Sequence, residues 1–148
     1  MFSFFRKRAV SNLDEKAIVD AIRGAESLSR AEIRVHLADK TGKIGALESA
    51  KKIFEKLGMH RTEMRNGVLI FVCLKERKFA IIGDVGIHQF VSDTFWDEVR
   101  IEMQEKLKQG QHTEAICHGI NRAGEKLQLH FPAGNQNPNE LSNEISRD

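Results

Sequence analysis

The stretch Arg65-Asn66-Gly67-Val68-Leu69-Ile70-Phe71-Val72-Cys73-Leu74 decides the fold. A turn signal, Asn66-Gly67, leads into an unbroken apolar run that is rich in β-branched and aromatic side chains. This composition is typical of a strand that is buried on both faces in the middle of a sheet. A charged turn at 75–78 separates it from a second apolar run. We therefore predict an antiparallel hairpin of strands 68–74 and 79–83.

An outer strand and a connecting helix are predicted on the N-terminal side of this hairpin. Residues 31–37 alternate polar and apolar side chains, which indicates a strand with one covered face. Residues 47–57 then carry apolar side chains at helical spacing, and Gly58 ends that helix. Strand, helix and strand at this spacing form a right-handed crossover, so strands 31–37 and 68–74 are predicted to be parallel.

Three further helices are predicted, at 13–29, 92–109 and 113–130. With the strands, they predict an α/β fold, a three-layer α/β/α sandwich that has a small mixed sheet and helices on both faces. The 148 residues fit one domain. We expect an N-terminal segment over 1–11, the α/β domain over 12–132, and a flexible C-terminal tail over 133–148, where polar residues and proline dominate.

Composition narrows the classes of function. The formal net charge is only +2, so no strong positive field favours nucleic acid as a partner. No apolar run approaches the ~20 residues of a transmembrane helix. Cys73 and Cys117 fit small buried thiols of a reducing compartment. Together these features favour a cytoplasmic protein with neither a nucleic-acid partner nor a transmembrane segment.

The first residues raise the question of a surface contact. Phe2, Phe4 and Phe5 precede the basic residues 6–8, whereas a secretory signal begins with the basic residues. One interpretation is a weak interfacial anchor on anionic lipid. The other, which we favour, is a packed or frayed terminus. A weak membrane or protein contact is thus assigned either to these phenylalanines or to the C-terminal tail.

Chain direction predicts where chemistry would be located. Strands 31–37 and 68–74 begin at the end of the sheet where strand 79–83 finishes. That end gathers five polar side chains: Glu32, Glu63, Arg65, Asn66 and Asp84. Oxygen ligands on loops are those that Ca²⁺ or Mg²⁺ requires. We predict a cation site whose ligands are Asp84, Glu32, Glu63 and Asp93, with Arg65 and Asn66 available to a phosphate or another substrate.

Each of these residues also has an ordinary structural interpretation. Glu32 fits a solvated strand face, Asp84 fits a turn between two glycines, and Asp93 fits a helix start. Only their convergence favours a site. His112, Cys117 and His118 lack the paired spacing of a zinc site. No catalytic nucleophile is evident, so catalytic residues remain unassigned.

The sequence resembles the TPM domain family in its short, cytoplasmic form. The matching stretches are Ala31-Glu32-Ile33-Arg34-Val35, Arg65-Asn66-Gly67-Val68-Leu69-Ile70, Ala80-Ile81-Ile82-Gly83-Asp84-Val85-Gly86-Ile87, Trp96, Gly119-Ile120, His130-Phe131-Pro132 and Asn139-Glu140-Leu141. The resemblance covers the chain from about residue 12 onward and implies an α/β/α sandwich. Family members have been linked to Ca²⁺ binding, acid phosphatase activity and photosystem repair. Longer members have a signal peptide and often a membrane anchor, and we expect neither here.

Three functions stay open at this point. The first is a module that binds a divalent cation, with Ca²⁺ preferred. The second is a phosphatase in which that cation polarises a phosphoryl oxygen while Arg65 holds the phosphate. The third is a module for contacts with proteins or membrane surfaces.

Overall fold

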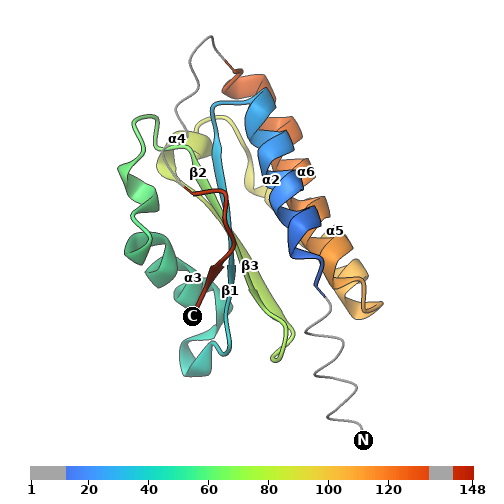
Figure 1. The fold of residues 1–148 in the computed structure, drawn as a ribbon. Coiled ribbons are helices and arrows are strands. Elements are labelled where there is room, and N and C mark those ends of the chain that lie inside the picture. The colour runs from blue at the N-terminus through green and yellow to red at the C-terminus, as the bar shows by residue number, and fades with distance from the viewer. Residues whose placement is uncertain (1–12, 134–141) are drawn as a thin grey trace, which may run out of the picture.

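A four-stranded mixed sheet lies at the centre of the computed structural model, which describes residues 13–133 and 142–148 (Figure 1). The strand order is β3-β2-β1-β4, with β1 at Glu32–Leu37, β2 at Gly67–Cys73, β3 at Lys78–Gly83 and β4 at Ser146–Arg147. Strand β2 runs parallel to β1 and antiparallel to β3. The predicted crossover and hairpin are therefore both confirmed.

Helices cover both faces of this sheet (Figure 1). One face packs against α2 (Glu15–Leu28), α5 (Asp93–Lys108) and α6 (His112–His130). The other face carries α3 (Gly45–Lys56), flanked by the short 3-10 turns η1 (Gly42–Ile44) and η2 (Met59–Arg61). A single short turn of helix, α4 (Val85–His88), follows β3. The predicted three-layer α/β/α sandwich is confirmed.

The apolar run in β2 is unbroken because both of its faces are covered. Val68, Ile70 and Val72 belong to the core beneath α2, α5 and α6. Leu69 and Phe71 point the other way, into the smaller core beneath α3. All residues of the strand are buried. Burial of this much apolar surface, at roughly 25 cal/mol per Å², makes β2 the centre of the hydrophobic stabilisation.

Helices α2 and α6 cross at Ala25 and Gly124. A Cβ atom added to Gly124 would lie 2.8 Å from the Cβ of Ala25, which has no flexible side chain that could move away. We expect Gly124→Ala to destabilise the protein by about 1–2 kcal/mol, because the helices must separate. This loss exceeds the ~1 kcal/mol that alanine gains over glycine as a helix former.

A double exchange provides the control for this prediction. Gly124→Ala combined with Ala25→Gly keeps one glycine and one alanine at the crossing, so the total helix propensity is unchanged. Urea unfolding should show the double variant more stable than Gly124→Ala alone. A double variant that is less stable than the single one would contradict the close crossing as the cause.

Strand β4 was not predicted, since the segment 133–148 had the composition of a flexible tail. In the structure Ser146 and Arg147 pair with β1, opposite His36 and Leu37. Side chains of this strand alternate between the two faces of the sheet edge. Composition could not indicate this pairing, because its polar side chains fit a solvated tail equally well.

Polar contacts on both faces of the sheet hold β4 beside β1. On the α3 side, His36 Nδ1 lies 3.0 Å from Ser146 Oγ and its Nε2 lies 2.8 Å from Asp148 Oδ1. On the opposite side, Arg147 forms an ion pair with Glu15 at the start of α2. Burial would raise the pKa of Asp148, but hydrogen bonds from the Asp39 N–H and from His36 hold it below its usual value. The end of the chain is thereby bound to β1 on one face of the sheet and to the start of α2 on the other.

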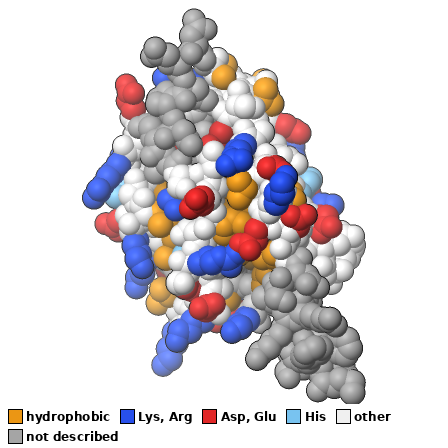
Figure 2. Space-filling view, in the orientation of Figure 1, with side chains coloured by type: hydrophobic (Ala, Val, Ile, Leu, Met, Phe, Trp, Pro, Cys, Tyr) orange, Lys and Arg blue, Asp and Glu red, His pale blue; other side chains and the backbone are white. Residues whose placement is uncertain are grey.

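The visible surface carries charges of both signs (Figure 2). Lys and Arg side chains are interspersed with Asp and Glu over this face, and an apolar strip lies between them. Within 13–133 and 142–148, no helix combines the length and the apolar character needed to cross a bilayer. The proposed surface contact of Phe2, Phe4 and Phe5 falls outside the described residues.

Candidate functional site

The sheet end predicted from chain direction is present in the structure. Glu32 pairs with Gly67, and Val68 pairs with Gly83. The Asp84 N–H then donates to the Gly67 carbonyl oxygen at 2.9 Å. The start of β1, the start of β2 and the end of β3 therefore lie side by side, and they bring Glu32, Asn66 and Asp84 to one end of the sheet.

Arg65 and Asp84 form a two-point ion pair at this end. The Arg65 Nε donates to Asp84 Oδ2 at 2.8 Å, and Nη2 donates to Oδ1 at 2.9 Å. The Asp84 side chain is 5% exposed, whereas that of Arg65 is 44% exposed. Hydrogen bonding to Asp84 raises the pKa of Arg65. A buried carboxylate thus carries a cationic partner that reaches in from the surface.

Asp84 also begins helix α4. Its Oδ1 accepts a hydrogen bond from the Val85 N–H at 2.7 Å, so the carboxylate caps the helix. Asp84 therefore has an ordinary structural role as a helix cap in addition to its place at the sheet end. Because Arg65 and Val85 both donate to it, the carboxylate is held in one orientation at the sheet end.

Gly86 holds the loop that contains Arg65 close to α4. Its N–H donates to the Arg65 carbonyl oxygen at 2.9 Å. Arg65 has a φ of 51°, in the left-handed region that non-glycine residues seldom adopt. A Cβ atom on Gly86 would lie 2.7 Å from the Arg65 carbonyl oxygen and closer still to that of Met64. A glycine is therefore required here for the close approach of two backbone segments.

Asn66 contributes a buried amide beside this pair. Its side chain is almost fully buried, and its Nδ2 donates to the Arg30 carbonyl oxygen at 2.9 Å. Its backbone N–H donates to Thr62 Oγ1 at 3.3 Å. The side-chain oxygen Oδ1 is buried without a hydrogen-bond partner. An unpaired buried amide oxygen is costly, which marks this position as unusual.

A second buried carboxylate, Glu26, lies near the start of β1. Its Oε2 accepts from the Ile33 N–H at 2.8 Å, and only 8% of the residue is exposed. Burial, with a smaller contribution from the negative charge of nearby Glu32, raises the pKa of Glu26 to about 8, although the hydrogen bond from the Ile33 N–H opposes this rise. Glu32 itself is 2% exposed, so it is not on a solvated strand face.

The other two predicted ligands lie on the surface. Glu63 is exposed in the loop before β2, and Asp93 is exposed in the first turn of α5, after the capping residue Ser92. In the part of the chain that the structure describes, no three His, Cys, Asp or Glu side chains are grouped so that they could hold a metal ion. The four predicted ligands are therefore not assembled around a common point.

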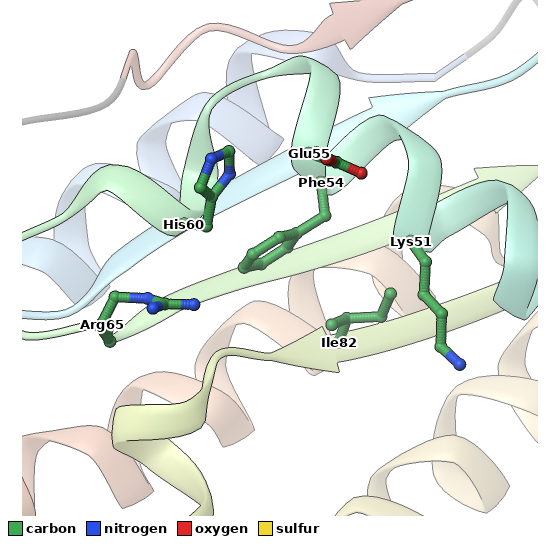
Figure 3. Close-up of a pocket in the computed structure, with 6 residues that line it drawn as sticks. All are labelled: Lys51, Phe54, Glu55, His60, Arg65 and Ile82. Atoms are coloured by element: carbon green, nitrogen blue, oxygen red, sulfur yellow. The ribbon is translucent and has the colours of Figure 1, made fainter.

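An open groove runs beside the ion pair, between α3 and β3. We call it the α3–β3 groove; its volume is about 360 Å³, and it is lined by Lys51, Phe54, Glu55, His60, Arg65 and Ile82. Figure 3 shows the Arg65 side chain extending toward Phe54 and Ile82 from one side, while Lys51 descends from α3 on the other. His60 Nδ1 is buried without a hydrogen-bond partner.

The sequence patterns did not indicate the groove residues on α3 or Glu26 as members of a site. A signal for Glu26 was present, because it follows Ile18, Ile22 and Ala25 on the buried stripe of α2. A glutamate at such a position predicts a buried carboxyl group. Lys51 carried no comparable signal, since surface lysines are common on helices and only the tertiary packing places this one beside Ile82.

Comparisons with known proteins agree with this architecture. The family model described as TPM domain matches residues 6–126. The solution structure of the BA42 protein from the psychrophilic bacterium Bizionia argentinensis is 45% identical, has a TM-score of 0.84, and matches over 90% of this chain and 92% of that chain. The N-terminal domain of the cg2496 protein from Corynebacterium glutamicum matches over 82% and 74%, with a TM-score of 0.62 and 14% identity, and so shares the fold. No curated protein matched the chain.

Proposed function

This chain belongs to the TPM domain family, and from that premise we propose that it binds a divalent cation, Ca²⁺ in preference to Mg²⁺, at the Arg65–Asp84 end of the sheet. The proposal rests on one observation. Asp84 is a buried, oriented carboxylate whose charge is balanced by a guanidinium that is 44% exposed. A cation that enters from solvent competes with Arg65 for the same two oxygens.

Further oxygen atoms support a cation at this place. Asn66 follows Arg65 directly, and its Oδ1 is buried without a hydrogen-bond partner. Glu32 pairs with the first residue of β2 at the same sheet end. Ca²⁺ accepts six to eight oxygen ligands in flexible geometry, including amide oxygens, backbone carbonyls and waters. Mg²⁺ requires a stricter octahedral arrangement, so this loop-built end suits Ca²⁺ better.

Competition with Arg65 sets the expected affinity. Few protein oxygens are available and a resident ion pair must open, so we expect a dissociation constant on the order of 10⁻³ M, as in weak calcium modules. Glu63 and Asp93 are surface carboxylates, and we expect them to add long-range attraction more than direct coordination.

Amide NMR titration with Ca²⁺ tests this proposal. In the wild-type protein, saturable shifts are expected around residues 64–67 and 84–86. Arg65→Gln should tighten binding by about tenfold, because charge-assisted hydrogen bonds of this kind are worth 1.5–3 kcal/mol. Asp84→Asn should abolish the shifts while it keeps an oxygen that can cap α4.

Arg61→Gln is the matched control. Arg61 is an exposed arginine on η2, so its removal changes the net charge equally and leaves Asp84 untouched. It should change the affinity only slightly. If Arg61→Gln and Arg65→Gln have equal effects, attraction by overall charge would replace competition as the explanation. Saturable shifts in Asp84→Asn would place any cation elsewhere.

A further inference from the structure

We propose that the α3–β3 groove is a binding site for a small carboxylate that carries an apolar body. The inference goes beyond the cation site, because the ligand is an anion and binds the edge of the Arg65 guanidinium that Asp84 leaves unused. Three features of the groove support it: free donors on Arg65, an apolar floor, and a lysine at the far side.

The first feature is the edge of the Arg65 guanidinium whose N–H donors are not used by Asp84. A guanidinium has five N–H donors, and Asp84 takes one from Nε and one from Nη2. The second N–H of Nη2 and both N–H groups of Nη1 remain. The adjacent N–H groups of Nη1 and Nη2 form a planar fork, which matches the two oxygens of a carboxylate. Asp84 fixes this fork in place, so little side-chain entropy is lost when an anion binds.

The second feature is the floor of the groove. Phe54 and Ile82 provide apolar surface between the cationic groups, and both are labelled in Figure 3. Ligand sites combine such apolar lining with a few polar groups that fix orientation. An inorganic anion would leave this surface without a partner, whereas a carboxylate on an aromatic or aliphatic body covers it.

The third feature is the charge around the groove. Lys51 lies on the side away from Arg65, and Glu55 is the acidic residue of the lining. Asp84 already offsets the charge of Arg65, and Glu48 offsets that of Lys51, whose Nζ donates to Glu48 Oε1 at 3.2 Å. Directed N–H donors, rather than a large positive field, are therefore what the groove offers. A monoanionic carboxylate fits this balance better than a dianionic phosphate ester does.

The test uses three probes of similar shape, added separately to the wild-type protein in buffer with EDTA. Benzoate carries a carboxylate, benzyl alcohol is neutral, and phenyl phosphate is dianionic. Amide NMR should show saturable shifts with benzoate at the groove residues. Benzyl alcohol should bind at least about tenfold more weakly, as expected when charge-assisted hydrogen bonds are lost. Phenyl phosphate should also bind more weakly than benzoate.

Variants separate this site from nonspecific attraction. Lys51→Gln should weaken benzoate binding by about two- to fivefold, within the range for an exposed charged contact. Lys52→Gln, at the neighbouring exposed position of α3 outside the groove lining, should leave it unchanged. Arg65→Gln should weaken benzoate binding by at least about tenfold. The same variant is expected to tighten Ca²⁺ binding, so the two proposals fail independently.

Several outcomes would overturn the assignment. Equal affinities for benzoate and benzyl alcohol would show that the carboxylate does not contribute to binding. Tighter binding of phenyl phosphate would make the groove a phosphoester site instead. Equal effects of Lys51→Gln and Lys52→Gln would leave only diffuse attraction, and shifts away from the groove would relocate the ligand.

Discussion

Gly86→Ala is expected to lower the free energy of unfolding by about 3 kcal/mol, at the upper end of the usual cost of overpacking. The added methyl group would overlap the carbonyl oxygens of Met64 and Arg65, which are backbone atoms and cannot rotate away. The 64–65 loop must move away from α4, and the hydrogen bond from the Gly86 N–H to the Arg65 carbonyl oxygen is then lost. Chemical denaturation of both proteins measures this difference.

Gly24→Ala serves as the matched control. Gly24 lies in α2, and an added Cβ atom there meets no atom within 4 Å. Alanine should therefore stabilise that helix by up to ~1 kcal/mol. Opposite signs for the two glycine replacements would show that the backbone approach at Gly86, and not glycine content, decides the result. A neutral Gly86→Ala would contradict the close approach.

Gly86→Ala should also affect ligand binding at the Arg65–Asp84 end of the sheet. Because the Arg65 loop is held by Gly86, its displacement should change the geometry of the Arg65–Asp84 pair. Ca²⁺ binding and benzoate binding should then both change in Gly86→Ala. This is expected even though Gly86 has no side chain to contact a ligand, so the variant acts by positioning Arg65.

The central strands could be predicted because their signals are local. An unbroken apolar run, as in β2, has few alternatives when a turn signal precedes it and a charged turn follows. Strict alternation at 32–37 likewise identified a strand, but the predicted outer position was wrong, because β4 pairs with its other edge and makes β1 an inner strand. Chain direction then followed from the crossover rule, and with it the shared end of Glu32 and Asp84. These inferences need only neighbouring residues and general rules of connection.

The remaining features depend on contacts between distant parts of the chain. β4 lies beside β1 because His36 and Asp148 meet, although more than a hundred residues separate them. Helix α2 begins at Glu15 after the cap Asp14, two residues later than the start predicted at 13. At the site, the sequence indicated both charges but not that Arg65 would neutralise Asp84. From the sequence alone, Arg65 and Asp84 could form an ion pair with each other, or Arg65 could bind a phosphate while Asp84 binds a metal ion.

Glu26 leads to the second large prediction, a stability that depends on pH. The folded-state pKa is about 8 because burial disfavours the charged carboxylate, whereas the ordinary value is 4.5. Below pH 4.5 the Glu26 carboxyl group is protonated in the folded and unfolded states alike, so its burial does not lower the free energy of unfolding through ionisation. Between pH 4.5 and 8 only the folded protein retains the proton, and stability falls as pH rises. Above pH 8 the loss is complete, on the order of 3–5 kcal/mol.

Glu26→Gln should remove this loss. Glutamine keeps a side-chain oxygen that can accept from the Ile33 N–H, but it has no charge to desolvate. We expect the variant and the wild type to have similar stability at pH 4.5, with the variant becoming more stable by a growing margin up to about pH 8. Urea unfolding at pH 4.5, 6, 7.5 and 9 measures that margin directly, since the other titrating groups cancel in the difference. Glu125→Gln, at an exposed position of α6, should give a small margin that does not grow. A constant margin for Glu26→Gln would mean that the carboxylate is already charged in the folded protein, stabilised by neighbours strong enough to offset its burial.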